Sequence, residues 1–349
     1  MSVTLNRQWR VARYPDAGEL IDKSHFHFAE DTLGPLDQGE FLVKTICLAP
    51  GPAQRAYLET RYADFYGDPI PIGSVMRGRG IGEIVASKHK DYQVGKIFVG
   101  SIGWQDYSIQ KPDQGKFIFS NRLIDNPIRP LSMHLGILGQ AGGTAYFGLK
   151  EAGRIKPGDN VLVSAAAGGV GSVAGQIARI KDAGIVVGIS STDQKCQWLC
   201  NELGYDVAIN YKSENLDNRI RELFPDGVDV FFDNVGGEIL NTCLKHLAMN
   251  ARIALGGYIS TQYNEKIFSG PTHYTQLINK RASMQGFVYF DYWDRYAEAE
   301  QALVDWYHKG LLTNSESIDE GLEMMPKSLA SLFTGENRGI KLCRVSPDP

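Results

Sequence analysis

The chain has 349 residues, with 36 Lys and Arg against 40 Asp and Glu, which gives a formal net charge of −4. This length favours two domains over one, and the balanced charge, without a basic cluster between aromatic residues, argues against nucleic acid as a partner. The sequence has no apolar stretch of about 18 residues and no signal-peptide core, so we expect a cytoplasmic protein without membrane association.

The cysteines favour reduced thiols over disulfides or metal ligation. They form an odd and scattered set of five: Cys47, Cys196, Cys200, Cys243 and Cys343. Cys196 and Cys200 stand four residues apart on a predicted helix, but no second pair or nearby histidine completes the ligand set of a structural zinc site. We therefore expect no metal site.

The amino-terminal part, from Trp9 to about Ile124, is expected to be rich in β-strands. It contains short β-prone runs separated by Gly, Pro and Asp, namely FLVKTICLA, GIGEIVAS and KIFVGSIGWQDYSI. The carboxyl-terminal run RGIKLCRV is also β-like and can pair with the same sheet. We therefore predict that residues 1–130 and 311–349 form one domain and that residues 131–310 are inserted as a second.

The inserted domain is expected to be a doubly wound parallel sheet, which gives the chain an α/β fold. A helical stretch, HLGILGQAGGTAYFGLKEAG, is followed by strands and helices that alternate. The predicted later strands are VVGI, DVAINY, VDVFFDNVGG and ARIALGG, and a helix is predicted over residues 292–309.

The most informative segment, residues 161–192, has the pattern of a strand, a glycine-rich turn, a helix and a second strand. Gly168 and Gly169 are expected to permit tight backbone angles and close ligand approach, and Gly171 to let the helix pack against the strand. Backbone amides and the positive end of the helix would then face a pyrophosphate. We interpret the segment as a dinucleotide site; the alternative is an empty strand-helix turn.

The end of the second strand indicates which dinucleotide binds. Ser190, Ser191 and Thr192 are followed by Lys195, where enzymes that use NAD usually carry Asp or Glu. Hydroxyl groups and a cation fit a 2′-phosphate, so we predict NADPH. Asp193 would repel that phosphate unless it caps the following helix, which we expect. The alternative for Lys195 is a solvated lysine of the first helical turn.

Two later strand ends carry further candidates, because ligands of open parallel sheets bind at the carboxyl ends of strands. Asn234 precedes Val-Gly-Gly, where it either contacts the cofactor or caps a turn. The second strand end carries the segment from Gly256 to Ser260.

Seven runs together resemble the zinc-independent medium-chain dehydrogenase/reductases, and among them the prostaglandin reductase and leukotriene 12-hydroxydehydrogenase family with its curcumin reductase and 2-alkenal reductase relatives. They are VMRGRGIGEIVAS, GGTAYFGL, SAAAGGVGSVAGQIARIK, LGYDVAINYK, FFDNVGGEILN, GGYIS and GENRGIK. The resemblance implies a GroES-like catalytic domain, a Rossmann domain, a homodimer, and NADPH-dependent reduction of a carbon–carbon double bond conjugated to a carbonyl.

The resemblance also implies the site residues. Lys195 and Tyr211 would meet the 2′-phosphate, Asn234 the nicotinamide ribose, and residues 287–289 would flank the nicotinamide. The full set of predicted cofactor contacts is Gly168, Gly169, Val170, Gly171, Ser191, Lys195, Tyr211, Asn234, Gly256, Gly257, Tyr258, Ile259, Ser260, Phe287, Val288, Tyr289 and Asn337.

Tyr263 resembles a family tyrosine near the substrate carbonyl and is the predicted catalytic residue. Hydride transfer to the β-carbon needs no metal if a donor stabilises the charge on the carbonyl oxygen, an effect of about 3 to 4 kcal/mol; water can protonate the α-carbon. The ribose hydroxyl is the alternative donor, Tyr263 then being a packing aromatic. One extra residue after Ile259 shifts its alignment.

The substrate stays open, because the loop at residues 48–57 departs from the family pattern; Tyr57, in this loop, is a predicted substrate contact. Arg77 and Arg79 either cover an acidic substrate or are solvated, and we favour solvation. A zinc alcohol dehydrogenase is excluded by the missing Gly-His-Glu segment and four-cysteine lobe. A quinone oxidoreductase and a non-catalytic NADPH sensor remain the alternatives.

Overall fold

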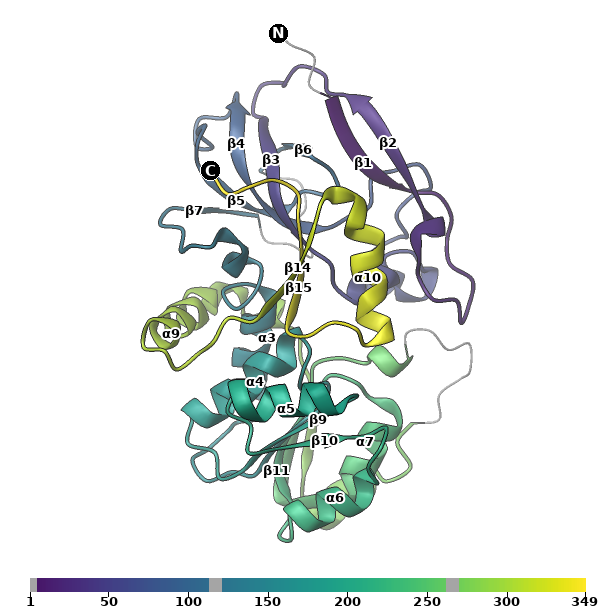
Figure 1. The fold of residues 1–349 in the computed structure, drawn as a ribbon, viewed down its shortest axis with the longest axis vertical. Helices are drawn as coiled ribbons and strands as arrows, with labels where there is room; N and C mark the ends of the chain where they lie inside the picture. The colour runs from purple at the N-terminus through teal and green to yellow at the C-terminus, as the bar shows by residue number, and fades with distance from the viewer. Residues whose placement is uncertain (1–4, 113–120, 262–269) are drawn as a thin grey trace. The chain divides into compact units, whose positions relative to one another are not determined.

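A computed structural model describes residues 5–112, 121–261 and 270–349. The chain divides into two compact units (Figure 1). The first unit comprises Met1–Leu135, Ser317–Glu336 and Lys341–Pro349, and the second comprises Gly136–Glu316 and Asn337–Ile340.

The first unit is built on a seven-stranded sheet with the order β14-β15-β3-β4-β5-β7, in which β6 also pairs with β3. Its strands are β3 (Phe41–Ala49), β4 (Arg79–Ser87), β5 (Ile97–Ser101), β6 (Tyr107–Gln110), β7 (Arg122–Ile124), β14 (Glu316–Glu320) and β15 (Ile340–Arg344). A separate antiparallel hairpin joins β1 (Leu5–Val11) to β2 (Phe26–Thr32), and the helices are α1 (Ala53–Ala56), α2 (Ala63–Tyr66) and α10 (Met325–Thr334).

The last strand returns to the first sheet, as the run RGIKLCRV predicts. Cys343 on β15 lies opposite Leu48 on β3 in an antiparallel pair, so the two chain ends share one sheet. Trp9, Phe41 and Phe98 from the amino-terminal strands and Leu329 from α10 lie in one buried cluster of the first unit.

One of the β-prone runs forms two strands. The run KIFVGSIGWQDYSI forms β5 and β6 with a turn between them, in which Gly103 adopts a φ of 73°. This left-handed backbone is open to glycine and costly for a bulky residue, so the chain turns there.

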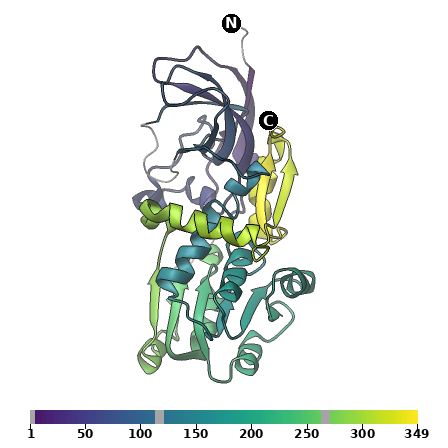
Figure 2. The same ribbon diagram turned by 90° about the vertical axis from the view of Figure 1, so that its left-hand side faces the viewer.

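The second unit contains a six-stranded parallel sheet with the order β10-β9-β8-β11-β12-β13 (Figure 2, teal to green). Its strands are β8 (Val161–Val163), β9 (Val186–Ser190), β10 (Val207–Asn210), β11 (Val228–Asp233), β12 (Leu247–Leu255) and β13 (Ser283–Gly286). Its helices are α3 (Gln140–Phe147), α4 (Gly169–Ile180), α5 (Asp193–Glu202), α6 (Leu216–Leu223), α7 (Gly237–Cys243), α8 (Gln276–Lys280) and α9 (Tyr296–His308).

The predicted α/β fold, with a β-rich part and a Rossmann-like parallel sheet, is confirmed. The central strands β8, β9 and β11 are short and almost entirely buried, as expected for a parallel sheet covered by helices. The helix predicted over residues 292–309 begins later, at Tyr296, because residues 289–295 form an irregular 3₁₀ segment.

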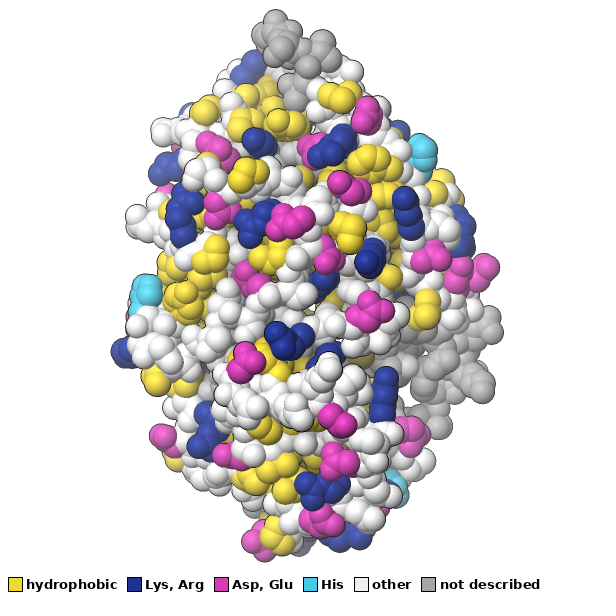
Figure 3. Space-filling view, in the orientation of Figure 1, with side chains coloured by type: hydrophobic (Ala, Val, Ile, Leu, Met, Phe, Trp, Pro, Cys, Tyr) yellow, Lys and Arg dark blue, Asp and Glu magenta, His cyan; other side chains and the backbone are white. Residues whose placement is uncertain are grey.

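Charged side chains of both signs are interspersed on the face drawn in Figure 3. Within the described residues, no helix combines the length and the hydrophobicity that crossing a lipid bilayer requires.

Candidate functional site

The predicted cofactor residues of the second unit gather at one edge of its sheet. Because the strands are parallel, their carboxyl ends share an edge. The glycine turn follows β8, Ser191 follows β9, Tyr211 follows β10 and Asn234 follows β11. Residues 256–260 follow β12 and residues 287–289 follow β13. Segments far apart in the sequence therefore form a single candidate site.

The glycine turn leads directly into the amino terminus of α4. Gly168 is the N-cap residue of this helix, no side chain caps it, and its first turn carries no acidic residue. The first backbone N–H groups of a helix lack intrahelical acceptors and attract anions. The left-handed residue of the turn is Ala165, with a φ of 46°, whereas the φ of Gly168 is −84°. Gly168 is therefore not required for a left-handed angle.

Gly171 provides room for close packing, as predicted. A Cβ atom on it would lie 2.4 Å from the carbonyl oxygen of Ala165, whereas one on Gly169 would meet nothing closer than 3.6 Å. Tyr205, which the sequence analysis missed, is buried and donates its hydroxyl to the carbonyl oxygen of Gly171 at 2.6 Å. A Cβ on Gly175 would lie 2.0 Å from the same ring. Tyr205 thus supports the first turns of α4.

Lys195 lies in the first turn of α5, half-buried at the carboxyl end of β9. Burial, and secondly the charge of Lys212, lowers the pKa of Lys195. A phosphate bound beside Lys195 would favour its protonated form. Tyr211, the other predicted 2′-phosphate contact, precedes Lys212 in the sequence and is 41% exposed.

Asp193 does not cap α5, contrary to expectation. The N-cap is Thr192, whose hydroxyl oxygen accepts from the backbone N–H of Lys195 at 3.3 Å. The Asp193 carboxylate instead accepts from Nδ2 of Asn210 at 2.7 Å. This bond gives the carboxylate a partner at the end of β10.

A buried polar cluster joins the ends of β8 and β11. The Asp233 carboxylate is fully buried and accepts from the Ser164 hydroxyl at 2.7 Å and from the backbone N–H groups of Val235 and Gly236 at 3.0 Å each. Burial raises the pKa of Asp233, and these bonds oppose the rise. Asn234 donates Nδ2 to the carbonyl oxygen of Ser164 at 2.8 Å. The Asn234 amide is therefore held in a fixed orientation.

The loops after β11 and β12 touch each other. A Cβ on Gly257 would lie 2.7 Å from the carbonyl oxygen of Asn234, and Ser260 donates its hydroxyl to the carbonyl oxygen of Val235 at 2.6 Å. Gly257 is thus needed for the close contact between the two loops, whether or not a ligand is bound.

Of the three residues after β13, two have side chains that pack inward. Phe287 and Tyr289 are 8% and 3% exposed, and the ring of Phe287 lies 5.8 Å from that of Phe232. Val288 between them is half-buried. Contact of this segment with a ligand would therefore involve Val288 or the backbone.

Residues 337–340 are hydrogen-bonded to the glycine turn. The backbone N–H of Gly339 donates to the carbonyl oxygen of Ala167 at 2.9 Å, and Gly339 forms a parallel bridge with Gly168. Arg338 lies over the ring of Trp198 on α5, with 5.2 Å from Cζ to the ring centroid. Asn337, a predicted cofactor contact, is thereby brought beside the candidate site despite its distance in sequence.

The two predicted substrate residues are not among those gathered at this sheet edge in the described part of the structure. Tyr263, the predicted catalytic residue, lies outside the described residues. Tyr57 is 3% exposed in the core of the first unit, where its ring lies 5.2 Å from that of Tyr66 and Arg77 lies over it. Direct contact of Tyr57 with a substrate would therefore involve only a small part of its surface.

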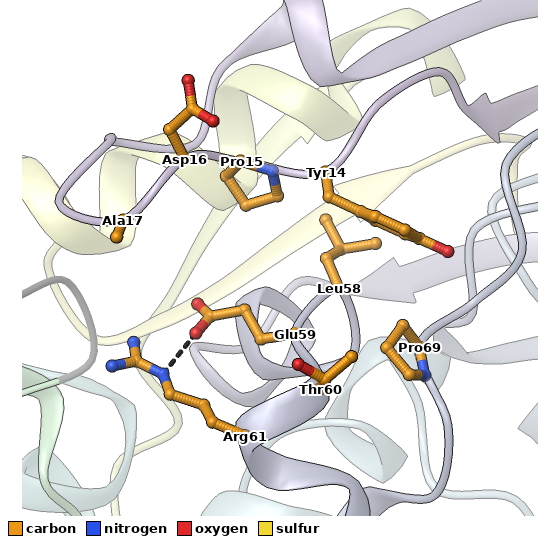
Figure 4. Close-up of a pocket in the computed structure, with 9 residues that line it drawn as sticks. All are labelled: Tyr14, Pro15, Asp16, Ala17, Leu58, Glu59, Thr60, Arg61 and Pro69. Atoms are coloured by element: carbon orange, nitrogen blue, oxygen red, sulfur yellow. Dashed lines mark ion pairs between the residues drawn. The ribbon is translucent and has the colours of Figure 1, made fainter. Parts of the chain in front are cut away.

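The first unit also has an open cavity of about 270 Å³ (Figure 4), and none of the predicted site residues lines it. Glu59 and Arg61 in its wall form an ion pair, and the Tyr14 hydroxyl donates to the carbonyl oxygen of Ile70 at 3.0 Å. The lining is Tyr14, Pro15, Asp16, Ala17, Leu58, Glu59, Thr60, Arg61 and Pro69.

Comparisons with known proteins place the chain. Residues 7–118 match the family model described as the N-terminal domain of oxidoreductase, and residues 169–306 match the model described as zinc-binding dehydrogenase. A Bacillus subtilis protein described as an NADP-dependent oxidoreductase is 42% identical over 98% of both chains. The chain belongs to the medium-chain dehydrogenase/reductase family.

Two further members of this family bear on the site. The NADPH-dependent curcumin reductase of Escherichia coli is 33% identical over 98% of both chains. The crystal structure of CurA from Vibrio vulnificus in complex with NADPH is 31% identical, with a TM-score of 0.89 over 98% of this chain and all of that one. These reductases belong to the zinc-independent branch of the medium-chain dehydrogenase/reductase family, and the chain falls with them.

In residues 5–112, 121–261 and 270–349, no group of three or more His, Cys, Asp or Glu side chains is placed to hold a metal ion. The cysteines in this part of the chain form no disulfide with one another.

Proposed function

We propose that the protein uses NADPH to reduce a carbon–carbon double bond conjugated to a carbonyl group. The observation that carries the proposal is the half-buried Lys195 beside Lys212, at the same sheet edge as the uncapped amino terminus of α4. A diphosphate and a 2′-phosphate are the groups that such an edge favours. The NADPH-dependent curcumin reductase supports both the cofactor and the reaction, because curcumin contains double bonds conjugated to carbonyls.

The roles of the cofactor residues follow from their atoms. Gly168, Gly169, Val170 and Gly171 would present backbone N–H groups to the diphosphate, and Lys195, Ser191 and Tyr211 would contact the 2′-phosphate. Nδ2 of Asn234 is engaged by Ser164, so its Oδ1 is the atom that would accept from a ribose hydroxyl. The remaining contacts would come from Gly256–Ser260, Phe287–Tyr289 and Asn337.

When bound, NADPH supplies the hydride that adds to the β-carbon of the substrate. Negative charge then accumulates on the carbonyl oxygen, where we assign Tyr263 as the hydrogen-bond donor. Water delivers the proton that completes the α-carbon, so no further acidic side chain is needed. The products are a saturated carbonyl compound and NADP.

Turnover with a panel of electron acceptors tests the proposal. Consumption of NADPH is followed with benzylideneacetone, a 2-alkenal and a benzoquinone, and repeated with NADH. We expect rapid reduction of the two conjugated carbonyl compounds with a preference for NADPH. Turnover of the quinone alone would instead indicate a quinone oxidoreductase, and NADPH binding without turnover would indicate a sensor.

A further inference from the structure

Arg338 is an exposed cation of the second unit that is held at two points beside the candidate cofactor site. Its backbone is fixed because the next residue, Gly339, donates its N–H to the carbonyl oxygen of Ala167 at 2.9 Å and forms a bridge with Gly168. Its side chain lies over the ring of Trp198, with 5.2 Å from Cζ to the ring centroid. The arginine is thus tied to the glycine turn through its backbone and to α5 through its side chain.

The ring of Trp198 gives the guanidinium a fixed surface to lie on. Trp198 is 4% exposed, and its Nε1 donates to Oε2 of Glu202 at 3.1 Å, so the plane of the ring is held by packing and by a hydrogen bond. A guanidinium that stacks on an aromatic face keeps the N–H groups of its rim available to an anion. A side chain ordered in this way before a ligand arrives loses less entropy on binding.

Trp198 and Lys195 lie on one face of α5, because residues three apart in a helix are neighbours. Lys195 is in the first turn of this helix, after β9. Burial, and secondly the charge of Lys212, lowers the pKa of Lys195, so Lys212 after β10 acts on the same region. Three separate segments therefore contribute a cation: α5, the loop after β10, and residues 337–340.

The acids of this region are engaged with other partners. The Asp193 carboxylate accepts from Nδ2 of Asn210 at 2.7 Å, and Glu214 pairs with Arg219 at 2.9 Å. Within the described part of the chain, no carboxylate forms an ion pair with Arg338. A phosphate bound in this region would thus meet cations whose charge these acids do not offset.

We propose that Arg338 determines cofactor specificity by binding the 2′-phosphate of NADPH together with Lys195, and that Trp198 positions it for this contact. The inference rests on the proposed function for the identity of the cofactor, but not on the reduction of any substrate. The fork of a guanidinium can donate to two phosphate oxygens at once, which the compact ammonium of Lys195 does not do. NADH carries a hydroxyl group in place of the phosphate and would lack this contact.

The affinities of the two dinucleotides test the assignment. Isothermal titration calorimetry would give the Kd for NADPH and for NADH with the wild-type protein, Arg338→Gln and Arg338→Lys. Arg338→Gln should raise the Kd for NADPH about 10-fold and leave the Kd for NADH nearly unchanged. Arg338→Lys should restore only part of the loss. An unchanged Kd for NADPH in Arg338→Gln, or an equal rise for NADPH and NADH, would overturn the proposal.

A fragment of the cofactor isolates the contact from the rest of the dinucleotide. Adenosine 2′,5′-bisphosphate should bind the wild type more tightly than adenosine 5′-phosphate does, and Arg338→Gln should remove most of this difference. A wild type without preference for either the bisphosphate or NADPH would reject the proposed cofactor together with this inference. A preference that Arg338→Gln leaves intact would reject the role of Arg338 alone.

Arg221→Gln is the matched control for the loss of one positive charge. Arg221 lies in the last turn of α6, where it is exposed and pairs with Asp217. This variant should change neither Kd, so an effect of net charge is separated from a contact with the phosphate. If Arg338→Gln lowered the melting temperature of the free protein and weakened NADH as much as NADPH, the arginine would be structural.

A double-mutant cycle tests the role of Trp198 as a positioning residue. Trp198→Leu should weaken NADPH binding in the wild-type background and have little further effect in Arg338→Gln, because the ring acts through the arginine. The Kd for NADH should change little in either background. Equal losses of NADPH affinity in both backgrounds would show that Trp198 does not act through Arg338.

Discussion

Lys195 is the residue on which cofactor choice should depend. It is half-buried near Lys212, and burial, and secondly the charge of Lys212, lowers its pKa, so an adjacent phosphate would stabilise its charged form. We predict that Lys195→Ala raises the Kd for NADPH about 10- to 100-fold and leaves the Kd for NADH nearly unchanged, as measured by isothermal titration calorimetry.

Lys156→Ala is the matched control for this variant. Lys156 is an exposed lysine that precedes β8, at the amino end of the same sheet, so it should affect neither cofactor. An equal loss of NADPH and NADH binding in Lys195→Ala would contradict the 2′-phosphate assignment.

The preference for NADPH should also depend on pH. Because the pKa of Lys195 is lowered in the free protein, the side chain loses its proton at a lower pH than an exposed lysine does. The ratio of NADPH to NADH affinity should therefore fall as the pH rises through the alkaline range. Calorimetric titrations at several pH values measure it, and a ratio independent of pH would speak against a charged Lys195 in the complex.

The role of a single residue is predictable from sequence where neighbouring residues determine it. It is not predictable where strands distant in sequence determine its burial. Gly171 was assigned to close packing from its place in the turn, and the 2.4 Å approach of Ala165 agrees. Solvation, the interpretation favoured from sequence, is wrong for Arg79, which is 3% exposed because β3 and β5 pair with its strand. A short polar run such as MRGRG does not indicate which strands will pair with it, and most arginines are exposed, so the sequence does not predict the burial of Arg79.

At the scale of the element, two glycines at the start of α4 have different roles: Gly171 is needed for packing, and Gly169 is proposed to give room for the cofactor. Gly171→Ala would place Cβ against the backbone of Ala165, so we predict a loss of stability of about 1 to 3 kcal/mol or more. Gly169→Ala meets no atom within 3.5 Å, so it should fold normally and weaken NADPH binding by crowding the diphosphate. Melting temperature and cofactor affinity of both variants are the measurements; equal melting temperatures would contradict the packing role.

Glu298 on α9 links this helix to α3. It accepts from the Tyr146 hydroxyl at 2.7 Å and pairs with Lys150 and Arg295, and these partners, Lys150 first, lower its pKa to about 2. The Glu298 side chain is 37% exposed, so screening by solvent limits how much its ion pairs stabilise the fold. Glu298→Gln should therefore lower the free energy of unfolding by about 1 kcal/mol at pH 7.

The sign of the pH effect follows from the lowered pKa. A carboxyl whose pKa is lower in the folded than in the unfolded state stabilises above the ordinary value of 4.5, and this stabilisation is lost as the pH falls toward 2. The difference between wild type and Glu298→Gln in urea denaturation should therefore shrink from pH 7 to pH 3.5. A difference that grew in acid would be inconsistent with the network.

Elements were predictable where apolar runs are long enough to identify a strand. The strands β8, β9, β10, β11 and β12 all match runs expected from the sequence. The strand β13 was missed, because its four residues, SMQG, are short and half polar. Its pairing with β12 makes it a strand, and that partner is not visible in a local pattern.

At the scale of the whole molecule, we expect a homodimer, as family resemblance implies. In the described sheet of the second unit, β13 is an edge strand, with β12 as its neighbour. Light scattering coupled to size exclusion should give twice the chain mass of 38.6 kDa. A mass of one chain across the accessible concentration range would refute this expectation.

Removal of metal should leave the activity of the whole protein unchanged, because the reaction needs only a donor at the carbonyl oxygen. Turnover after dialysis against a chelator, compared with turnover after addition of zinc, measures this. Loss of activity that zinc restores would contradict a reaction without metal.

The fate of the hydride tests the proposed reaction most directly. The protein would be supplied with benzylideneacetone and NADPH that carries deuterium at both positions on C4 of the nicotinamide, and the product examined by NMR. We expect a saturated ketone with deuterium on the β-carbon and a solvent-derived proton on the α-carbon. Deuterium on the carbonyl carbon of an allylic alcohol, or no transfer to the substrate, would show that the protein does not reduce the conjugated double bond.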